Sequence, residues 1–150
     1  MSQAPLQFAK DVSAKANDAW LSGEYLERVT PTTKQLLTYW FGDQYCENRG
    51  LNFHEGQRQA ILNIIYLHEV LKTKSIFDAY EQIAPDLLLR SEGGLAEISK
   101  TKYNHPKYAI KMATGTGKTW VLSATLIWQY LNAKHEDGNF TKNFLIVAPG

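Results

Sequence analysis

The sequence predicts an α/β protein built around one strand, turn, helix and strand unit. A short apolar run, Tyr108–Met112, leads into a glycine-rich turn, helical spacing extends from Lys118 to Lys134, and a second apolar run, Phe144–Ala148, follows a polar loop. Two strands joined by a helix should be parallel, with a right-handed crossover. We therefore expect an incomplete parallel sheet with flanking helices, preceded by a mainly helical N-terminal extension.

Composition limits the classes of function without choosing one. The 44% hydrophobic content is enough to form a core, whereas 16 Lys and Arg against 15 Asp and Glu leave no basic footprint of a dedicated nucleic-acid binder. Cys46 is the only cysteine, which excludes an internal disulfide and a cysteine-based zinc site. The polar start of the chain and its lack of a long apolar run favour a cytoplasmic location without a membrane span.

The first half of the chain is expected to be helical. Residues 1–30 are polar and weakly periodic, and they end at the Thr30-Pro31 turn. Apolar residues cluster on one helical face from Thr32 to Phe41, where Gly42 is a natural stop. From Gln57 to Lys72 the apolar stripe also has the helical period.

A further helix is predicted downstream of that stripe. Ser75 precedes Asp78 by three residues, which is typical of a capping box, and Pro85 should end the helix at about Ala84. The stretch Ser91–Gly94 is expected to be a loop.

The sequence TGTGKT, Thr114 to Thr119, is typical of a phosphate-binding loop. Gly115 and Gly117 allow backbone N–H groups to approach phosphate oxygens, and Thr114 and Thr116 complete the loop. The helix that begins at Lys118 adds the positive end of its dipole. We expect the Lys118 side chain to reach the β- and γ-phosphates of ATP and the Thr119 hydroxyl to bind Mg²⁺, which makes these two the candidate catalytic residues.

A glycine-rich turn can also be purely structural, but an apolar run before it and a helix after it are the surroundings that phosphate binding requires. The general pattern of this loop would place glycine at position 112, where this sequence has Met112. The segment MATGTGKT resembles motif I of superfamily 2 helicases, in which this first position is often small or apolar. Together with LIVAPG it resembles the first motor domain of DEAD/DEAH-like helicases, in the Res-subunit branch of type III restriction enzymes.

The resemblance covers residues 53–150 and implies a RecA-like ATP-binding domain, with residues 1–52 as the extension. It implies that Gln57, in a setting with Ala60 and Ile61 that matches the family, recognises adenine. A carboxamide can pair with adenine N6 and N7, although Gln57 could also be an ordinary solvent-facing residue. Residues 73–107 would be an insertion.

The resemblance also implies that Val147 to Gly150 begin motif Ia, with Pro149 and Gly150 beside a nucleic-acid backbone. A buried strand followed by a turn would explain the same residues. No Walker B acid is recognisable, because Glu136-Asp137 follows a polar stretch and is expected to lie in a solvated loop. With the arginine finger of a second motor domain also missing, we expect an N-terminal fragment that is inactive alone.

The function that the resemblance implies is ATP hydrolysis that drives translocation on double-stranded DNA, with a modification (methyltransferase) subunit as the possible partner. Two other classes remain open. One is a P-loop kinase or another NTPase unrelated to nucleic acid. The other is a regulatory module that binds nucleotide without turnover.

Overall fold

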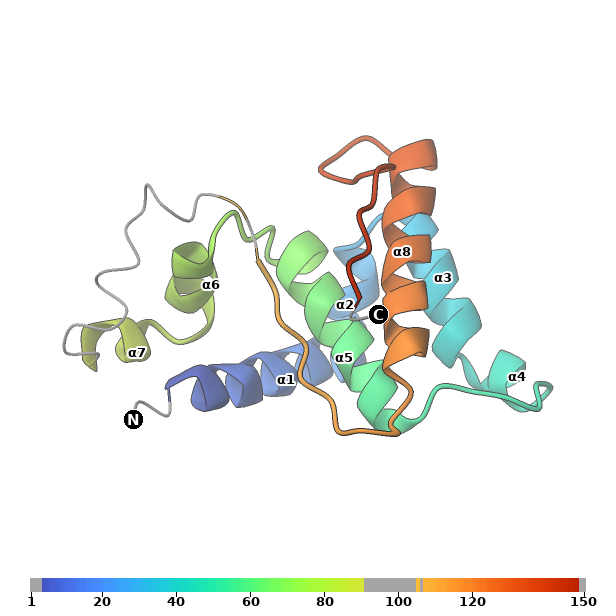
Figure 1. Cartoon of the computed structure of the whole chain (residues 1–150), viewed down its shortest axis with the longest axis horizontal. Helices are drawn as coiled ribbons and strands as arrows, with labels where there is room; N and C mark the ends of the chain where they lie inside the picture. The colour runs from blue at the N-terminus through green and yellow to red at the C-terminus, as the bar shows by residue number, and fades with distance from the viewer. Residues whose placement is uncertain (1–3, 91–104, 106, 149–150) are drawn as a thin grey trace. The chain divides into compact units, whose positions relative to one another are not determined.

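A computed structural model describes residues 4–90, 105 and 107–148 (Figure 1). The chain divides into two compact units, and neither is continuous in sequence. Unit 1 comprises Met1–Arg28 and Leu62–Lys111, and unit 2 comprises Val29–Ile61 and Met112–Gly150. The division falls within helix α5 (Glu55–Ile65).

The predicted parallel sheet is wrong for this structure, because the described residues contain helices and irregular segments but no strand. Both runs expected as strands, Tyr108–Met112 and Phe144–Ala148, lack ladder partners in the described part of the chain. They are also poorly buried, since Leu145 is 90% exposed and Val147 is 84% exposed. An apolar run becomes a strand only where a neighbouring strand takes its backbone hydrogen bonds. The expected βαβ unit therefore reduces to its turn and its helix.

Unit 1 is built from helices around an apolar core. Helix α1 (Ala4–Ser22) packs against α2 (Glu24–Glu27) and α6 (Ile76–Ile83). Tyr25 is fully buried, and its hydroxyl donates a hydrogen bond of 2.6 Å to the carbonyl oxygen of Leu62. A buried hydroxyl needs such a partner, so this bond fixes how α2 meets the core. Other buried core residues are Val12, Ala16, Ile65, Leu67, Val70, Tyr80 and Ile83.

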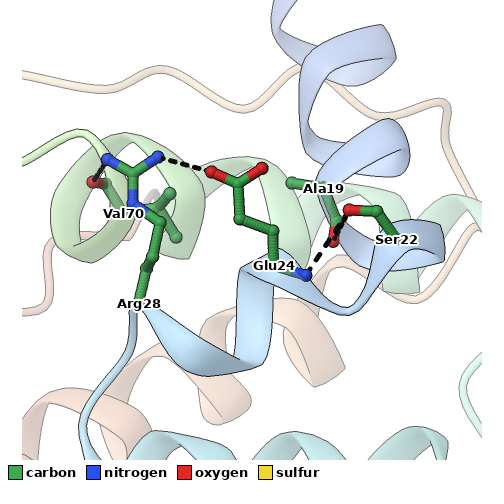
Figure 2. Close-up of polar contacts among 5 residues, drawn as sticks. All are labelled: Ala19, Ser22, Glu24, Arg28 and Val70. Atoms are coloured by element: carbon green, nitrogen blue, oxygen red, sulfur yellow. Dashed lines mark hydrogen bonds and ion pairs between the residues drawn. The ribbon is translucent and has the colours of Figure 1, made fainter.

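Figure 2 shows the polar contacts around α2. The Ser22 hydroxyl donates to the carbonyl oxygen of Ala19 at 3.1 Å and accepts from the Glu24 N–H at 3.4 Å, where Gly23 turns the chain with φ 82°. Arg28 pairs with the Glu24 carboxylate at 3.1 Å and donates to the carbonyl oxygen of Val70 at 3.0 Å. The guanidinium thus joins α2 to the end of the helical segment that precedes Leu71.

The predicted helix over 57–72 is confirmed, although it begins at Glu55 and changes geometry. Helix α5 continues as a π-helix, η1 (Tyr66–Val70), and Leu71 N–H donates to the carbonyl of Tyr66, five residues back. The Ser75 cap is confirmed because its hydroxyl accepts from the Asp78 N–H at 3.1 Å. Pro85 ends α6 as predicted, and it also begins a further helix, α7 (Pro85–Arg90), because proline fits a first helical turn. The predicted loop 91–94 lies outside the described residues.

Unit 2 holds α3 (Pro31–Phe41) packed against α8 (Lys118–His135), and both predicted helices are confirmed (Figure 1). A buried polar group joins them. The Thr33 hydroxyl accepts from Trp128 Nε1 at 3.1 Å and from Asn132 Nδ2 at 2.9 Å. Thr33 and Asn132 are both fully buried, and the Asn132 amide oxygen accepts from the Thr30 hydroxyl. The short helix α4 (Asp43–Cys46) follows α3.

Glu136 was expected to be a solvated loop residue, but it is half-buried at the end of α8. Its carboxylate accepts from the backbone N–H of Thr32 at 3.0 Å and from the Thr32 hydroxyl at 2.7 Å. A carboxylate in this place caps the first turn of α3 and is favoured by the helix dipole. Glu136 is therefore tied to the scaffold of unit 2.

No helix within the described ranges has the length and apolarity needed to cross a bilayer.

Candidate phosphate-binding site

The phosphate loop begins with a tight turn. The Thr116 N–H donates to the carbonyl oxygen of Ala113 at 3.3 Å, and the Thr116 hydroxyl donates to the same oxygen at 2.6 Å. Gly115 stands third in this turn with φ 79°, the left-handed conformation that a type II turn requires. Thr114, second in the turn, is exposed. The Thr116 side chain is therefore used to close the turn.

Helix α8 begins directly after the loop. Its N-cap is Gly117, with φ 73° and ψ 45°, and no side chain caps the helix there. The first backbone N–H groups of a helix have no partner within the helix, which makes an uncapped start suitable for an anion. Lys118 and Thr119 occupy the first turn, and both are exposed. The structure thus places all six residues of the predicted loop at one helix terminus.

Gln57 comes from the first turn of α5 and lies against this loop in unit 2. Its Nε2 donates to the carbonyl oxygens of Gly117 at 3.1 Å and Thr116 at 3.3 Å. Its Oε1 accepts from the backbone N–H of His54 at 3.0 Å. Gln57 is 5% exposed, so it is not the solvent-facing residue that the sequence left open as an alternative.

The adenine contact expected of Gln57 stays a prediction. Its Nε2 donates to two loop carbonyls, while Oε1 accepts one hydrogen bond and keeps a second lone pair. Adenine N6 could donate to that oxygen directly. Pairing with N7 would require Nε2 to leave one of the two loop carbonyls.

A cavity of about 440 Å³ opens beside the loop, within unit 2. This volume lies within the range of small-molecule sites, about 300–1,000 Å³. Phe53 and Trp120 both line it and contact each other edge to face, with ring centroids 6.2 Å apart, and Trp120 is 52% exposed. The lining is Tyr39, Trp40, Arg49, Leu51, Asn52, Phe53, His54, Gln57, Gly115, Thr116, Gly117, Trp120, Ser123, Ala124 and Ile127. It is aromatic and apolar along α8 and polar at the loop.

Arg49 supplies a positive charge to this lining. Its guanidinium lies over the ring of Tyr39, 4.7 Å from the centroid, and donates to the carbonyl oxygen of Trp40 at 2.9 Å. The Arg49 Nε is buried without a hydrogen-bond partner. No carboxylate is among the described lining residues. The cavity is therefore suited to an anionic ligand with a flat, apolar portion.

Only the first two residues of the expected motif Ia, Val147 and Ala148, lie within the described part of the chain. Val147 and Ala148 are exposed, and no described element covers them as a buried strand would require. Pro149 and Gly150 lie outside the described residues, so their predicted nucleic-acid contact stays a prediction.

The expected insertion, residues 73–107, begins and ends at neighbouring positions in unit 1, because the hydroxyls of Thr73 and Tyr108 are hydrogen-bonded at 2.8 Å.

Sequence reasoning missed the residues that support the loop from outside it. His54 Nε2 lies 2.7 Å from the carbonyl oxygen of Thr116, and Phe53 packs against Trp120. A usable signal was present: His54 and Gln57 are three residues apart at the start of an apolar stripe, the spacing of a capping box.

Comparison with known families gave one finding. The family model described as type III restriction enzyme, res subunit, matches residues 50–150, which include α5, the phosphate loop, α8 and the segment after it. Comparisons with curated proteins and with solved structures found no match.

Proposed function

Because this chain belongs to the type III restriction enzyme Res-subunit family, we propose that it binds ATP with Mg²⁺ at Thr114–Thr119 as part of an ATP-driven DNA motor. Membership supports a helicase-like role for the whole protein. The binding of ATP is supported by the residues themselves, and one observation carries it.

That observation is the meeting of two left-handed glycines, an uncapped helix start and two exposed polar side chains in six consecutive residues. Gly115 and Gly117 have φ values of 79° and 73°, which side-chain-bearing residues rarely adopt. A Cβ at position 117 would also collide with Gln57 Nε2. The loop is thus shaped by conditions that only glycine meets, next to a terminus that favours phosphate.

The adenine base of ATP would occupy the cavity beside the loop. Phe53 and Trp120 offer aromatic surface there, and adenine is flat and largely apolar on its faces. Gln57 Oε1 belongs to a lining residue and accepts one hydrogen bond, and it would accept a second from the N6 amino group of adenine. ATP is favoured over GTP on this account, because the O6 of guanine cannot donate to that oxygen.

Lys118 would neutralise the β- and γ-phosphates, and the Thr119 hydroxyl would be a ligand of the Mg²⁺ that bridges them. The donor set fits this cofactor: both side chains are exposed at the first turn of α8, and a Mg²⁺ ion bound with a nucleotide takes most of its ligands from phosphate and water. The described lining of the cavity contains no carboxylate. The role proposed for Lys118 and Thr119 is therefore to bind Mg-ATP. Hydrolysis requires a further group to orient water.

Double-stranded DNA is the proposed track of the motor, and a modification (methyltransferase) subunit is its proposed partner. Both rest on the family alone. Pro149 and Gly150 would contact the DNA backbone. A cytoplasmic location accords with this role.

The test is a titration of the 150-residue chain with Mg-ATP, in which the fluorescence of Trp120 and the other tryptophans reports binding. Lys118→Ala should weaken binding at least tenfold, since one charge-assisted contact is worth about 1.5–3 kcal/mol. Lys134→Ala is the matched control, because this exposed lysine lies at the opposite end of α8. Equal affinity of the Lys118→Ala variant and the wild type would reject the assignment.

A further inference from the structure

His54 is held on both sides of its imidazole ring. Its Nδ1 lies 3.1 Å from the backbone N of Gly56 and 3.4 Å from that of Gln57, and its Nε2 lies 2.7 Å from the carbonyl oxygen of Thr116. His54 immediately precedes α5, so its ring is the N-cap of that helix. One side chain therefore caps a helix and also contacts the phosphate loop.

The hydrogen-bond pattern fixes the tautomer of the neutral ring. A backbone N–H can only donate, so Nδ1 must accept from Gly56 and Gln57 and carries no proton. The proton is then on Nε2, which donates to the carbonyl oxygen of Thr116. The opposite tautomer would place a proton against two donors and a lone pair against a carbonyl oxygen.

The His54 backbone is held by Gln57, and the exposed ring lies close to Gly56. Gln57 Oε1 accepts from the backbone N–H of His54 at 3.0 Å, which completes a reciprocal capping box. Gly56 leaves room for the ring, since a Cβ there would lie 3.2 Å from His54 Cε1 and 3.4 Å from Nδ1. A Cβ at position 56 would require the imidazole to shift by a few tenths of an ångström.

Peptide planarity carries the consequence into the loop. In a trans peptide the C=O of one residue and the N–H of the next point in opposite directions. His54 draws the Thr116 carbonyl toward α5, so the Gly117 N–H must face away from α5. Gln57 Nε2 shares the Thr116 carbonyl with His54, at 3.3 Å, and also binds the Gly117 carbonyl at 3.1 Å, so it directs the Lys118 N–H as well.

We propose that His54 is a positioning residue of the phosphate loop, which orients the Gly117 N–H toward an incoming phosphate before the nucleotide binds. The proposal rests on the proposed function for its ligand, ATP. It adds a residue outside the loop whose bond to Thr116 lowers the cost of ordering the loop on binding. A site that is ordered in advance retains more of its interaction energy as affinity.

The two roles of His54 can be separated by substitution. Asparagine is among the best N-cap residues, so His54→Asn should keep the start of α5 and retain the stability of the chain. Its side chain is shorter than that of histidine and does not reach the Thr116 carbonyl. His54→Ala removes both the cap and the contact. The pair therefore distinguishes capping from loop positioning.

The first measurement needs no nucleotide. In NMR spectra of the wild-type 150-residue chain, the imidazole nitrogen shifts should report the tautomer protonated at Nε2, and in His54→Asn the Gly117 amide should shift and exchange faster with solvent. The second is the affinity for Mg-ATP, which should fall roughly 3- to 10-fold in His54→Asn, the effect of one net hydrogen bond.

Protonation at Nδ1 in the wild type, or an unchanged Gly117 amide in folded His54→Asn, overturns the positioning role whether or not ATP binds. Unchanged ATP affinity in His54→Asn overturns it as well. A wild-type chain that binds no ATP contradicts the proposed function instead, while the ligand-free spectra still decide the role of His54.

Discussion

The amide nitrogen of Gln57 occupies the space that a Cβ on Gly117 would need. A Cβ built on Gly117 falls well inside van der Waals contact with Gln57 Nε2, and the same nitrogen donates to the Gly117 carbonyl at 3.1 Å. The left-handed backbone thus requires the glycine, and a Cβ there would also displace the Gln57 amide. Gly115 has a similar φ, but nothing lies within 4 Å of its Cβ position.

This contrast predicts different effects for two chemically identical substitutions. Gly115→Ala should cost about 1 kcal/mol of stability, the strain of a left-handed alanine, and should leave Gln57 in place. Gly117→Ala adds a clash that expels the Gln57 amide, so it should destabilise the chain further and weaken Mg-ATP binding by more than Gly115→Ala does. Chemical denaturation and nucleotide titration of both variants measure this. Equal losses of stability and of Mg-ATP affinity in the two variants would show that the contact between Gln57 and Gly117 contributes to neither.

The helices of the site could be predicted from the sequence because their signals are local. Thr30 and Ser75 cap α3 and α6 with their own hydroxyls, and the glycines of the phosphate loop adopt the conformations their residue type suggests. The contact between Gln57 and Gly117 spans 60 positions along the chain, and no local pattern encodes it. Its existence depends on how α5 and the loop pack.

The predicted sheet is wrong for a related reason. The continuous apolarity of Phe144–Ala148 indicates a strand only if another strand lies beside it, and pairing is not a property of the run itself. The backbone hydrogen bonds of α8 form within the helix itself, so this helix could be predicted without knowing which element packs beside it. The helical elements were accordingly predictable and the sheet was not.

Gln57 gives the second prediction. Gln57→Ala removes two bonds to the loop carbonyls and one to His54, so affinity for both ATP and GTP should fall. If adenine pairs with Gln57 as predicted, the loss for ATP should exceed the loss for GTP. Competition titrations with the two nucleotides measure the ratio, and Gln35→Ala, an exposed glutamine on α3, is the control. An unchanged ratio of ATP to GTP affinity would leave Gln57 as a positioning residue only.

The buried polar group between α3 and α8 gives the third prediction. Thr33→Val keeps the shape of the side chain but removes the acceptor of Trp128 Nε1 and Asn132 Nδ2. A buried donor without a partner costs roughly 1–3 kcal/mol, so the free energy of unfolding should fall by at least that amount. Thr125→Val makes the same chemical change on α8, where the half-buried hydroxyl donates to the carbonyl of Val121, and should shift stability by about 0.5 kcal/mol or less. Denaturant titrations compare the two, and similar values would contradict this role for Thr33.

Tyr25 gives the fourth prediction, a loss of stability at alkaline pH. Burial raises the pKa of its hydroxyl well above the usual value of 10.0, and the nearby Glu69 carboxylate adds to the increase. The folded state therefore holds the proton more tightly than the unfolded state. The resulting stabilisation is complete below pH 10.0 and is lost as the pH rises above it toward the folded-state pKa.

Tyr25→Phe tests this directly. The variant loses the hydrogen bond to the carbonyl of Leu62 and should be about 1 kcal/mol less stable at neutral pH. Above pH 10.0 its stability should fall less steeply than that of the wild type, because one buried titrating group is gone. Burial also raises the pKa values of Tyr66 and Tyr80, so some alkaline dependence should remain in the variant. Parallel curves of unfolding free energy against pH for the two proteins would show that the Tyr25 hydroxyl does not control the alkaline limit.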